Sequence, residues 1–300
     1  MASKTGTILL AIALIIIIAF SGCISKQKTE QIVKQKAFIG GNEGISIEKM
    51  TGLPPDQIYE GQDFQIGVTL KNKGEAEASN IVVSVAGIDA TRFQLSPVSE
   101  QLIKLSPVSK IGDTMIPGGQ AQIIFNAKAP DIVGAQAQYP LQIIAIYDYS
   151  TQAVAGVCMK ESLIQQTTAG PEICKLTGNK PVESSGAPMK VVSVEELPTG
   201  FNIKIKNVGR GYPFVSTTRP SNEGDINPFT QKDRVEISAK LGDTTLTCTQ
   251  SVLLLTNNEA TVFCPATLSA GAEYVEQLAI KLNYGYVERI STTLNILAIS

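Results

Sequence analysis

The side chains of this chain that are best suited to chemistry belong to its five cysteines. The separation of Cys158 and Cys174 along the sequence equals that of Cys248 and Cys264. The chain has no CxxC motif, so the spacing does not match a zinc site, whereas an even set of cysteines is typical of disulfides formed in an oxidising compartment. Four cysteines allow three pairings, and the equal spacing favours Cys158–Cys174 and Cys248–Cys264.

One residue type that many catalytic sites use is missing. The chain has no histidine, which removes the usual general base and the commonest metal ligand. The adjacent carboxylates Glu195 and Glu196 lie in a strand-like stretch, where neighbouring side chains point to opposite faces. The formal net charge is −2, so the chain lacks the excess of positive charge that is typical of nucleic-acid-binding proteins. We therefore expect a protein that is not an enzyme, has no cofactor and binds no nucleic acid.

The N-terminus has the features of an export signal. Lys4 precedes an apolar run from Ile8 to Phe20, which is shorter than the roughly 20 residues of a membrane-spanning helix. Ser21 and Gly22 before Cys23 resemble the lipobox of prokaryotic lipoproteins, in which this cysteine is lipidated and becomes the mature N-terminus. We therefore expect a signal segment over residues 1–22, lipidation of Cys23 and a polar tether over residues 23–42.

Two other interpretations of this segment stay open. Residues 8–20 could remain as an uncleaved anchor, or the chain could be a pilin-like subunit cut after Gly6. The polar and basic stretch from Ser25 to Lys36 favours the tether, because it suits a solvated stalk beside anionic headgroups better than a long apolar pilin helix.

Beyond Gly44 the sequence is typical of strands almost throughout. Segments such as Phe64–Leu70 and Phe201–Ile205 alternate apolar and polar residues, and glycine, proline, asparagine and aspartate separate them. No amphipathic helix of useful length occurs. The sequence therefore predicts an all-β fold of antiparallel sandwiches, with the apolar residues of these two segments facing the cores.

An internal repeat divides the chain. Asn72 and Asn207 each begin an Asn-x-Gly element after a strand, and the same separation along the sequence recurs between Tyr149 and Tyr284 near the ends of the two halves. We interpret the repeat as two tandem immunoglobulin-like sandwiches, and we expect the tyrosines to be buried rings with hydrogen-bonded hydroxyl groups, as in a tyrosine corner. The expected ranges are residues 43–162 and 188–300, joined by a linker over residues 163–187.

The first half also resembles a known family. Residues 60–85, which run from Glu-Gly-Gln through the Asn-x-Gly element into the next strand, resemble the start of a CARDB-type domain. Such domains are immunoglobulin-like modules of bacterial and archaeal surface proteins, and they also occur in S-layer-associated proteins. The resemblance covers the whole first half. In the second half it covers only the strand with its Asn-x-Gly element and the final hairpin. It implies an extracellular setting in a prokaryotic lipoprotein, with an archaeal source favoured. The family has no catalytic residues that could be assigned to this chain.

One segment departs from the repeat. The segment 212–232 is much longer than the equivalent Glu75–Ser79, and long ordered loops are usually functional or mobile. Glu223 and Asp225 offer oxygen ligands for a hard cation such as Ca²⁺, but their spacing does not match an EF-hand, so we expect a solvated turn rather than a metal site. Aromatic and arginine side chains often anchor interfaces, and the candidates here are Tyr212, Phe214, Arg219 and Phe229.

The sequence as a whole predicts a lipid-anchored protein on the extracellular face of the cell membrane. Its immunoglobulin-like domains are expected to bind another envelope protein or a surface glycan, without catalysis. Two alternatives stay open. One is a pilin-like or surface-layer structural subunit, and the other is an accessory lipoprotein of a transporter or an extracellular enzyme.

Overall fold

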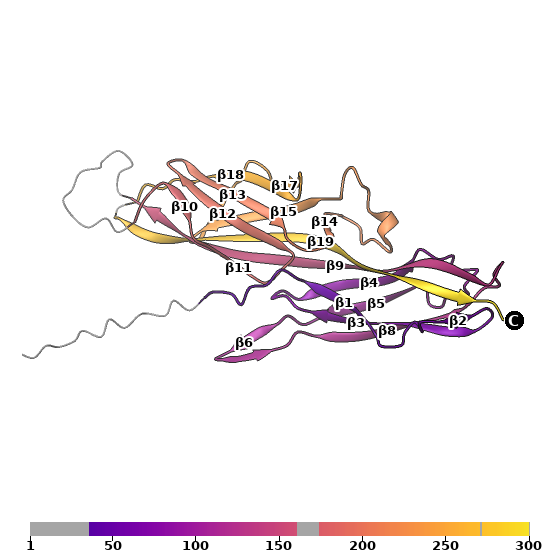
Figure 1. The fold of residues 1–300 in the computed structure, drawn as a ribbon. Coiled ribbons are helices and arrows are strands. Elements are labelled where there is room, and N and C mark those ends of the chain that lie inside the picture. The colour runs from indigo at the N-terminus through magenta and orange to yellow at the C-terminus, as the bar shows by residue number, and fades with distance from the viewer. Residues whose placement is uncertain (1–35, 161–173, 271, 300) are drawn as a thin grey trace, which may run out of the picture. The chain divides into compact units, whose positions relative to one another are not determined.

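A computed structural model describes residues 36–160, 174–270 and 272–299 of the chain. The regular elements of this part are β-strands, apart from one short 3-10 helix, so the all-β prediction is confirmed (Figure 1). The signal segment, Cys23 and most of the predicted tether lie outside the described residues. Within the described part, no helix is long and apolar enough to cross a membrane.

The alternating segments form the strands that the sequence predicts. In β3 (Asp63–Asn72), Phe64, Ile66, Val68 and Leu70 are buried. In β13 (Gly200–Asn207), the same is true of alternate residues from Phe201 to Ile205. Polar residues between them face outward, because successive side chains of a strand point to opposite faces. The predicted core faces of both strands are therefore confirmed.

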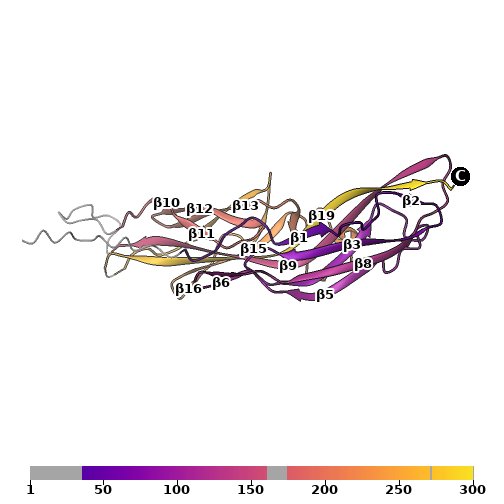
Figure 2. The ribbon, with the colours of Figure 1, turned by 60° about the horizontal axis from the view of Figure 1, so that its bottom comes forward.

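Each half has a small antiparallel sheet of its own. In the first half the order is β1-β3-β8, and these strands run side by side in Figure 2. The strands are β1 (Ile45–Lys49), β3 (Asp63–Asn72) and β8 (Gln120–Lys128). In the second half the order is β10-β12-β13-β18, with β10 (Gly178–Lys180), β12 (Met189–Leu197), β13 (Gly200–Asn207) and β18 (Glu259–Pro265).

A ten-stranded sheet runs through both halves, with β16-β15-β19-β9-β4-β5 as its main path. Its strands are β2 (Ile58–Tyr59), β4 (Ala78–Ala86), β5 (Ser99–Leu105), β9 (Gln136–Met159), β11 (Val182–Ser184), β14 (Tyr212–Phe214), β15 (Arg234–Leu241), β16 (Thr244–Leu246), β17 (Val252–Leu254) and β19 (Tyr274–Leu297). A separate hairpin consists of β6 (Ser109–Ile111) and β7 (Thr114–Ile116), and the 3-10 helix η1 spans Glu223–Asp225.

The two longest strands join the halves. β9 and β19 each have 24 residues and pair antiparallel along their whole length (Figure 1). Near the middle Asp148 pairs with Gly285, and tyrosine pairs flank this point on both sides, Tyr147 with Tyr286 and Tyr149 with Tyr284. The pair Asp148–Gly285 therefore marks a local two-fold axis, which makes Tyr149 of β9 equivalent to Tyr286 of β19.

This pairing changes the predicted domain organisation. Residues 36–300 form one compact unit, because each of the two long strands contributes to the cores of both halves. Part of the predicted linker, residues 163–187, is also regular structure, since β10 pairs with β12 and β11 pairs with β9. The linker prediction is therefore wrong over residues 178–184, where backbone groups find partners in the sheets.

The repeated Asn-x-Gly elements hold the tyrosines. Tyr149 donates its hydroxyl hydrogen to Asn72 Oδ1 at 3.0 Å, and Tyr286 donates to Asn207 Oδ1 at the same distance. A Cβ atom on the following Gly74 would overlap the Tyr149 hydroxyl, so the glycine is needed for close approach and not for a positive φ. The expectation of a buried, hydrogen-bonded ring is confirmed for Tyr149 and Tyr284, and Tyr286 rather than Tyr284 is the equivalent of Tyr149. Tyr274, which the repeat also predicts to be buried, is 41% exposed at the start of β19.

Candidate functional site

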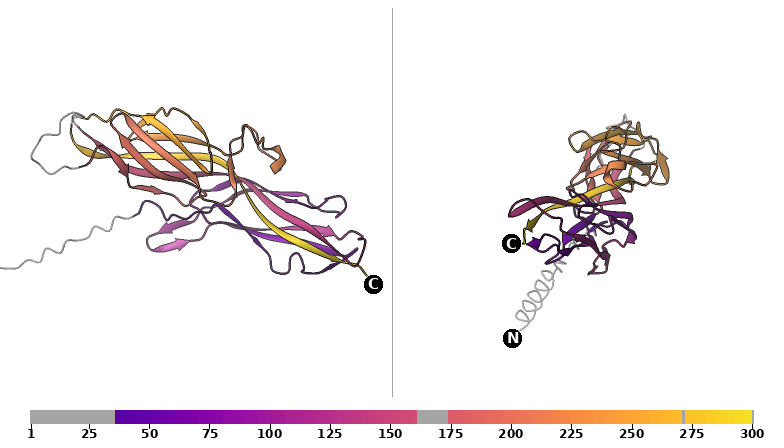
Figure 3. Two further views of the ribbon diagram at one scale, coloured as in Figure 1. Left: turned by 45° about the horizontal axis from the view of Figure 1, so that its top comes forward. Right: turned by 90° about the vertical axis from the view of Figure 1, so that its right-hand side faces the viewer.

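The long segment between β13 and β15 is the main difference between the two halves. It begins with β14, which pairs with Gly285–Val287 of β19, and it projects beyond the neighbouring strands as the orange loop with η1 in Figure 3. The loop closes where the Asp233 amide donates to the Pro213 carbonyl at 2.8 Å and the Val215 amide donates to the Gln231 carbonyl at 3.0 Å. Both ends are therefore fixed to the sheet.

Phe214 holds the loop on the sheet. It is 2% exposed and packs with Ile144, Ile146, Ile226 and Val287 in a small apolar cluster that is separate from the main core. A Cβ atom on Gly285 would overlap the Phe214 ring, so a glycine is required where the ring crosses β19. The prediction that Phe214 anchors a partner is therefore wrong, because the local apolar cluster buries its ring.

Tyr212 is also engaged within the protein. Its hydroxyl donates to Glu223 Oε1 at 2.7 Å, and Lys232 Nζ lies 4.5 Å from the centre of its ring. Burial and the neighbouring Glu223 carboxylate raise the pKa of Tyr212 far above its ordinary value. Arg289 forms an ion pair with the same carboxylate. These contacts tie the loop to β19, so Tyr212 positions the loop.

The two carboxylates proposed as weak metal ligands have protein partners. Glu223 binds Tyr212 and Arg289, whereas Asp225 Oδ2 accepts hydrogen bonds from the backbone amides of Ser221 at 2.7 Å and Asn222 at 3.2 Å. These contacts close the turn that contains η1. In the described part of the chain, the two residues do not belong to a group of three closely spaced metal-ligating side chains.

Phe229 and Arg219 are the predicted anchors that face solvent. Phe229 is 85% exposed, yet its backbone is well held. The amides of Phe229 and Thr230 donate to Asn227 Oδ1 at 2.9 and 3.1 Å, and Arg234 donates to the Phe229 carbonyl at 3.2 Å. A large aromatic ring is thus presented to solvent on an ordered turn, which lowers the entropy lost when a partner binds.

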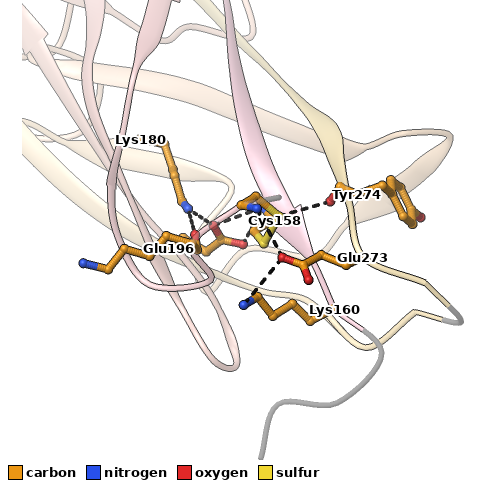
Figure 4. The surroundings of a disulfide bond; sticks show 8 residues. Cys158, Lys160, Lys180, Glu196, Glu273 and Tyr274 are labelled. Carbon is orange, nitrogen blue, oxygen red and sulfur yellow. Dashed lines mark hydrogen bonds and ion pairs between the residues drawn. A yellow bond between two sulfur atoms is a disulfide. The ribbon is translucent and has the colours of Figure 1, made fainter. Parts of the chain in front are cut away.

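The two disulfides have the pairing that the sequence favours. Cys158 is bonded to Cys174, with 5.6 Å between Cα atoms, and Cys248 is bonded to Cys264. The first disulfide lies beside Glu273, whose carboxylate accepts a hydrogen bond from the Cys174 amide at 3.2 Å (Figure 4). These three residues are the one group in the described residues with metal-ligand proximity. Because the two sulfur atoms are bonded to each other, they serve as a covalent link.

A buried ion pair that the sequence does not predict lies beside this disulfide. Glu196 is fully buried, accepts hydrogen bonds from the Cys158 amide through both oxygens at 3.0 and 3.1 Å, and pairs with Lys180 Nζ at 2.6 Å (Figure 4). Burial raises the pKa of Glu196, and Lys180 opposes this effect. The alternation of β12 does predict that Glu195 and Glu196 face opposite sides, but the sequence contains no signal for the partner Lys180.

The comparisons with known proteins give little guidance. No known family and no curated protein matches the sequence. Among solved structures, the secreted serine protease VesC from Vibrio cholerae aligns at 11% identity over 83% of this chain, with a TM-score of 0.19. The alignment spans 51% of VesC, so this chain matches about half of its length.

Two further structures are similarly distant. Spo0M, a sporulation control protein from Bacillus subtilis, aligns at 9% identity over 83% of this chain and 90% of its own, with a TM-score of 0.19. The CupB6 tip adhesin from Pseudomonas aeruginosa aligns at 9% identity over 85% of this chain and 97% of its own, with a TM-score of 0.20. Scores this low do not establish a shared fold, so function is inferred from the residues themselves.

Proposed function

We propose that this protein is a non-enzymatic binding protein of the cell envelope, tethered to the extracellular face of the membrane through a lipid on Cys23. Its two halves are proposed to be copies of an immunoglobulin-like sandwich that share the strands β9 and β19. The partner is another envelope protein or a surface glycan. The lipobox-like segment and the two disulfides support an extracellular setting.

The observation that carries the binding role is the exposed Phe229 on its ordered turn. Phe214 holds the surrounding loop on the face of the sheet, and the Tyr212–Glu223–Arg289 contacts tie the loop to β19. A loop that served only to cover the apolar cluster beneath it would need Phe214 and Ile226, which are buried, but not an aromatic ring in solvent. Exposed aromatic and arginine residues are the usual anchors of protein interfaces, so the contact surface is assigned to Phe229 and Arg219.

The first test compares two exposed apolar residues. Phe229→Ala is expected to reduce partner recovery at least about tenfold, which corresponds to a loss of about 1.4 kcal/mol in binding. Recovery is measured by affinity purification of tagged protein from detergent-solubilised envelope of the source cells, followed by mass spectrometry. The melting temperature should not change, because the removed ring contacts solvent.

Ile103→Ala is the matched control for this test. Ile103 is 86% exposed on β5 and therefore has nearly the same exposure as Phe229. Its replacement should leave partner recovery unchanged. Equal recovery with Phe229→Ala and with the unaltered protein would contradict the assignment of the contact surface to this loop.

A further inference from the structure

The outer edge of β19, on the side away from β9, contains a stretch without a partner strand. Along this edge β15 pairs as far as Asn283, β14 pairs with Gly285–Val287, and β2 pairs with Ile296 and Leu297. Among the residues that the structure describes, no strand pairs with this edge over residues 288–295. Unpaired backbone amide and carbonyl groups of such an edge can accept an additional strand.

The other half shows what fills the equivalent edge. Because the local two-fold axis makes Asp148 equivalent to Gly285, residues 153–155 of β9 are equivalent to residues 290–292 of β19. At that place β11 adds to the sheet, with Val182–Ser184 paired to Ala153–Ala155. Among the residues that the structure describes, an extended segment therefore pairs at one of the two equivalent edges and none pairs at the other.

A cavity of about 460 Å³ lies beside the open edge. Its lining combines apolar residues such as Ile290 with Ser46, Arg210 and Glu288. The Ser46 hydroxyl oxygen is buried and has no hydrogen-bond partner among the described residues. Arg210 and Glu288 form no ion pair in the same part of the chain. The cavity thus contains one buried hydroxyl group without a partner among the described residues, beside an arginine and a glutamate that form no ion pair there.

Glu288 is a half-buried carboxyl group of this cavity. Burial raises the pKa of this carboxyl to about 7, and Arg210 opposes the rise. The other charged groups that line the cavity are Glu43, Glu48 and Lys73, and Lys73 lies 3.5 Å from Glu43 and 3.6 Å from Glu48. Of the two cations that line the cavity, Arg210 is therefore the one without an ion pair among the described residues, although it also attracts the Glu288 carboxylate.

The residue equivalent to Arg210 binds the backbone of two segments near β11, one before β1 and one directly after β11. Arg210 is the third residue after Asn207, and Glu75 is the third residue after Asn72. The Glu75 carboxylate accepts hydrogen bonds from the backbone amides of Ile39 at 2.8 Å, Gly40 at 2.8 Å and Gly186 at 2.6 Å. Arginine at this position replaces a hydrogen-bond acceptor by a donor, so the matching group on an incoming segment is an acceptor. A carboxylate is the acceptor that forms a charge-assisted pair with a guanidinium group.

We propose that the open edge of β19 and this cavity bind an extended peptide segment of a partner protein, which pairs with residues 288–292 and places a carboxylate against Arg210. The segment adds to β19 as β11 adds to β9. Backbone pairing supplies the general affinity, and Arg210 selects for an acidic side chain or a free C-terminus. This surface involves neither Phe229 nor Arg219, so its test is independent of the partner test above.

The probe is a fluorescent peptide with the sequence of residues 180–188 and a free C-terminal carboxylate, because this segment occupies the equivalent place in the other half. Anisotropy with the full chain in detergent should give a Kd below about 1 mM. Hydrogen exchange of residues 288–292 should slow when the peptide is added. A peptide with E183P and S185P, which lacks two of the backbone amides that a strand requires, should not bind.

Variants of the protein then test the role of the guanidinium group. Arg210→Gln should weaken binding at least about tenfold, and Arg210→Lys should weaken it less because the charge remains. Arg92→Gln, at an exposed arginine outside both proposed surfaces, should have no effect. The proposal is overturned by absence of binding up to about 1 mM, by equal affinity of Arg210→Gln and the unaltered protein, or by slowed exchange at residues 153–155 instead of 288–292. Because the exchange measurement uses the unaltered protein, it remains decisive if Arg210→Gln fails to fold.

Discussion

Asn72→Ala is expected to lower the free energy of unfolding by about 3–5 kcal/mol. The Asn72 side chain is 2% exposed and makes four hydrogen bonds. Its Nδ2 donates to the carbonyls of Ala76 at 2.8 Å and Leu105 at 3.1 Å, and its Oδ1 accepts from the Gly74 amide at 3.1 Å and the Tyr149 hydroxyl at 3.0 Å. Alanine would leave these buried partners unsatisfied, and each such group costs about 1–3 kcal/mol without full additivity. Urea denaturation measures the effect.

Two variants serve as graded controls for this prediction. Tyr149→Phe removes one of the four bonds and also the long bond of 3.4 Å that the Ala76 amide donates to the hydroxyl. It should cost about 1–2 kcal/mol. Asn207→Ala should cost less than Asn72→Ala, because Asn207 makes three bonds, with the Gly211 carbonyl, the Gly209 amide and the Tyr286 hydroxyl. An Asn72→Ala variant that is no less stable than Tyr149→Phe would show that the asparagine does not organise this part of the sheet.

Lys180→Met is expected to destabilise the protein by about 3–5 kcal/mol at pH 8, because it leaves the Glu196 carboxylate buried without its counter-ion. The Lys180 side chain is 11% exposed and that of Glu196 is fully buried, so water cannot replace the ammonium group easily. The pKa of Glu196 is already raised by burial and would rise further without Lys180. A carboxyl whose pKa is higher in the folded than in the unfolded state destabilises the fold as pH rises, so the loss should shrink at pH 5.

The double variant Lys180→Met with Glu196→Gln separates charge from packing. Glutamine keeps an oxygen that can accept the hydrogen bond from the Cys158 amide but carries no charge. Most of the lost stability should therefore return at pH 8, and the double variant should show little dependence on pH between 5 and 8. A double variant as unstable as Lys180→Met at both pH values would mean that the loss comes from packing around Lys180.

The strands and their core faces could be predicted from the sequence because they depend on local alternation. Residues from Phe64 to Leu70 alternate clearly, and both disulfides follow from equal spacing. The sharing of β9 and β19 could not be predicted, because the pairing of Asp148 with Gly285 joins distant parts of the sequence and leaves no local pattern. The equivalent tyrosines could not be identified from the sequence, because the equivalence of Tyr149 and Tyr286 depends on the two-fold pairing of β9 with β19 and on the contact of each tyrosine with its asparagine.

The candidate site was predicted only in outline. Its position followed from the unequal lengths of the equivalent connections after Asn72 and Asn207. The sequence does not show which aromatic residues of the loop are buried. Their burial depends on the outer face of a sheet that contains residues of both halves. Phe214 and Phe229 are both loop phenylalanines in the sequence, yet they are 2% and 85% exposed.

Site-specific photo-cross-linking can capture a partner at the loop itself. A photoreactive phenylalanine analogue is placed at Phe229 in the full chain, and a second protein carries it at Ile103 as a control of nearly equal exposure. After irradiation of intact cells, we expect a discrete cross-linked species with the analogue at Phe229 and none at Ile103. No adduct at Phe229, or the same adducts at both positions, would contradict the proposal that this loop is the contact surface of an envelope binding protein.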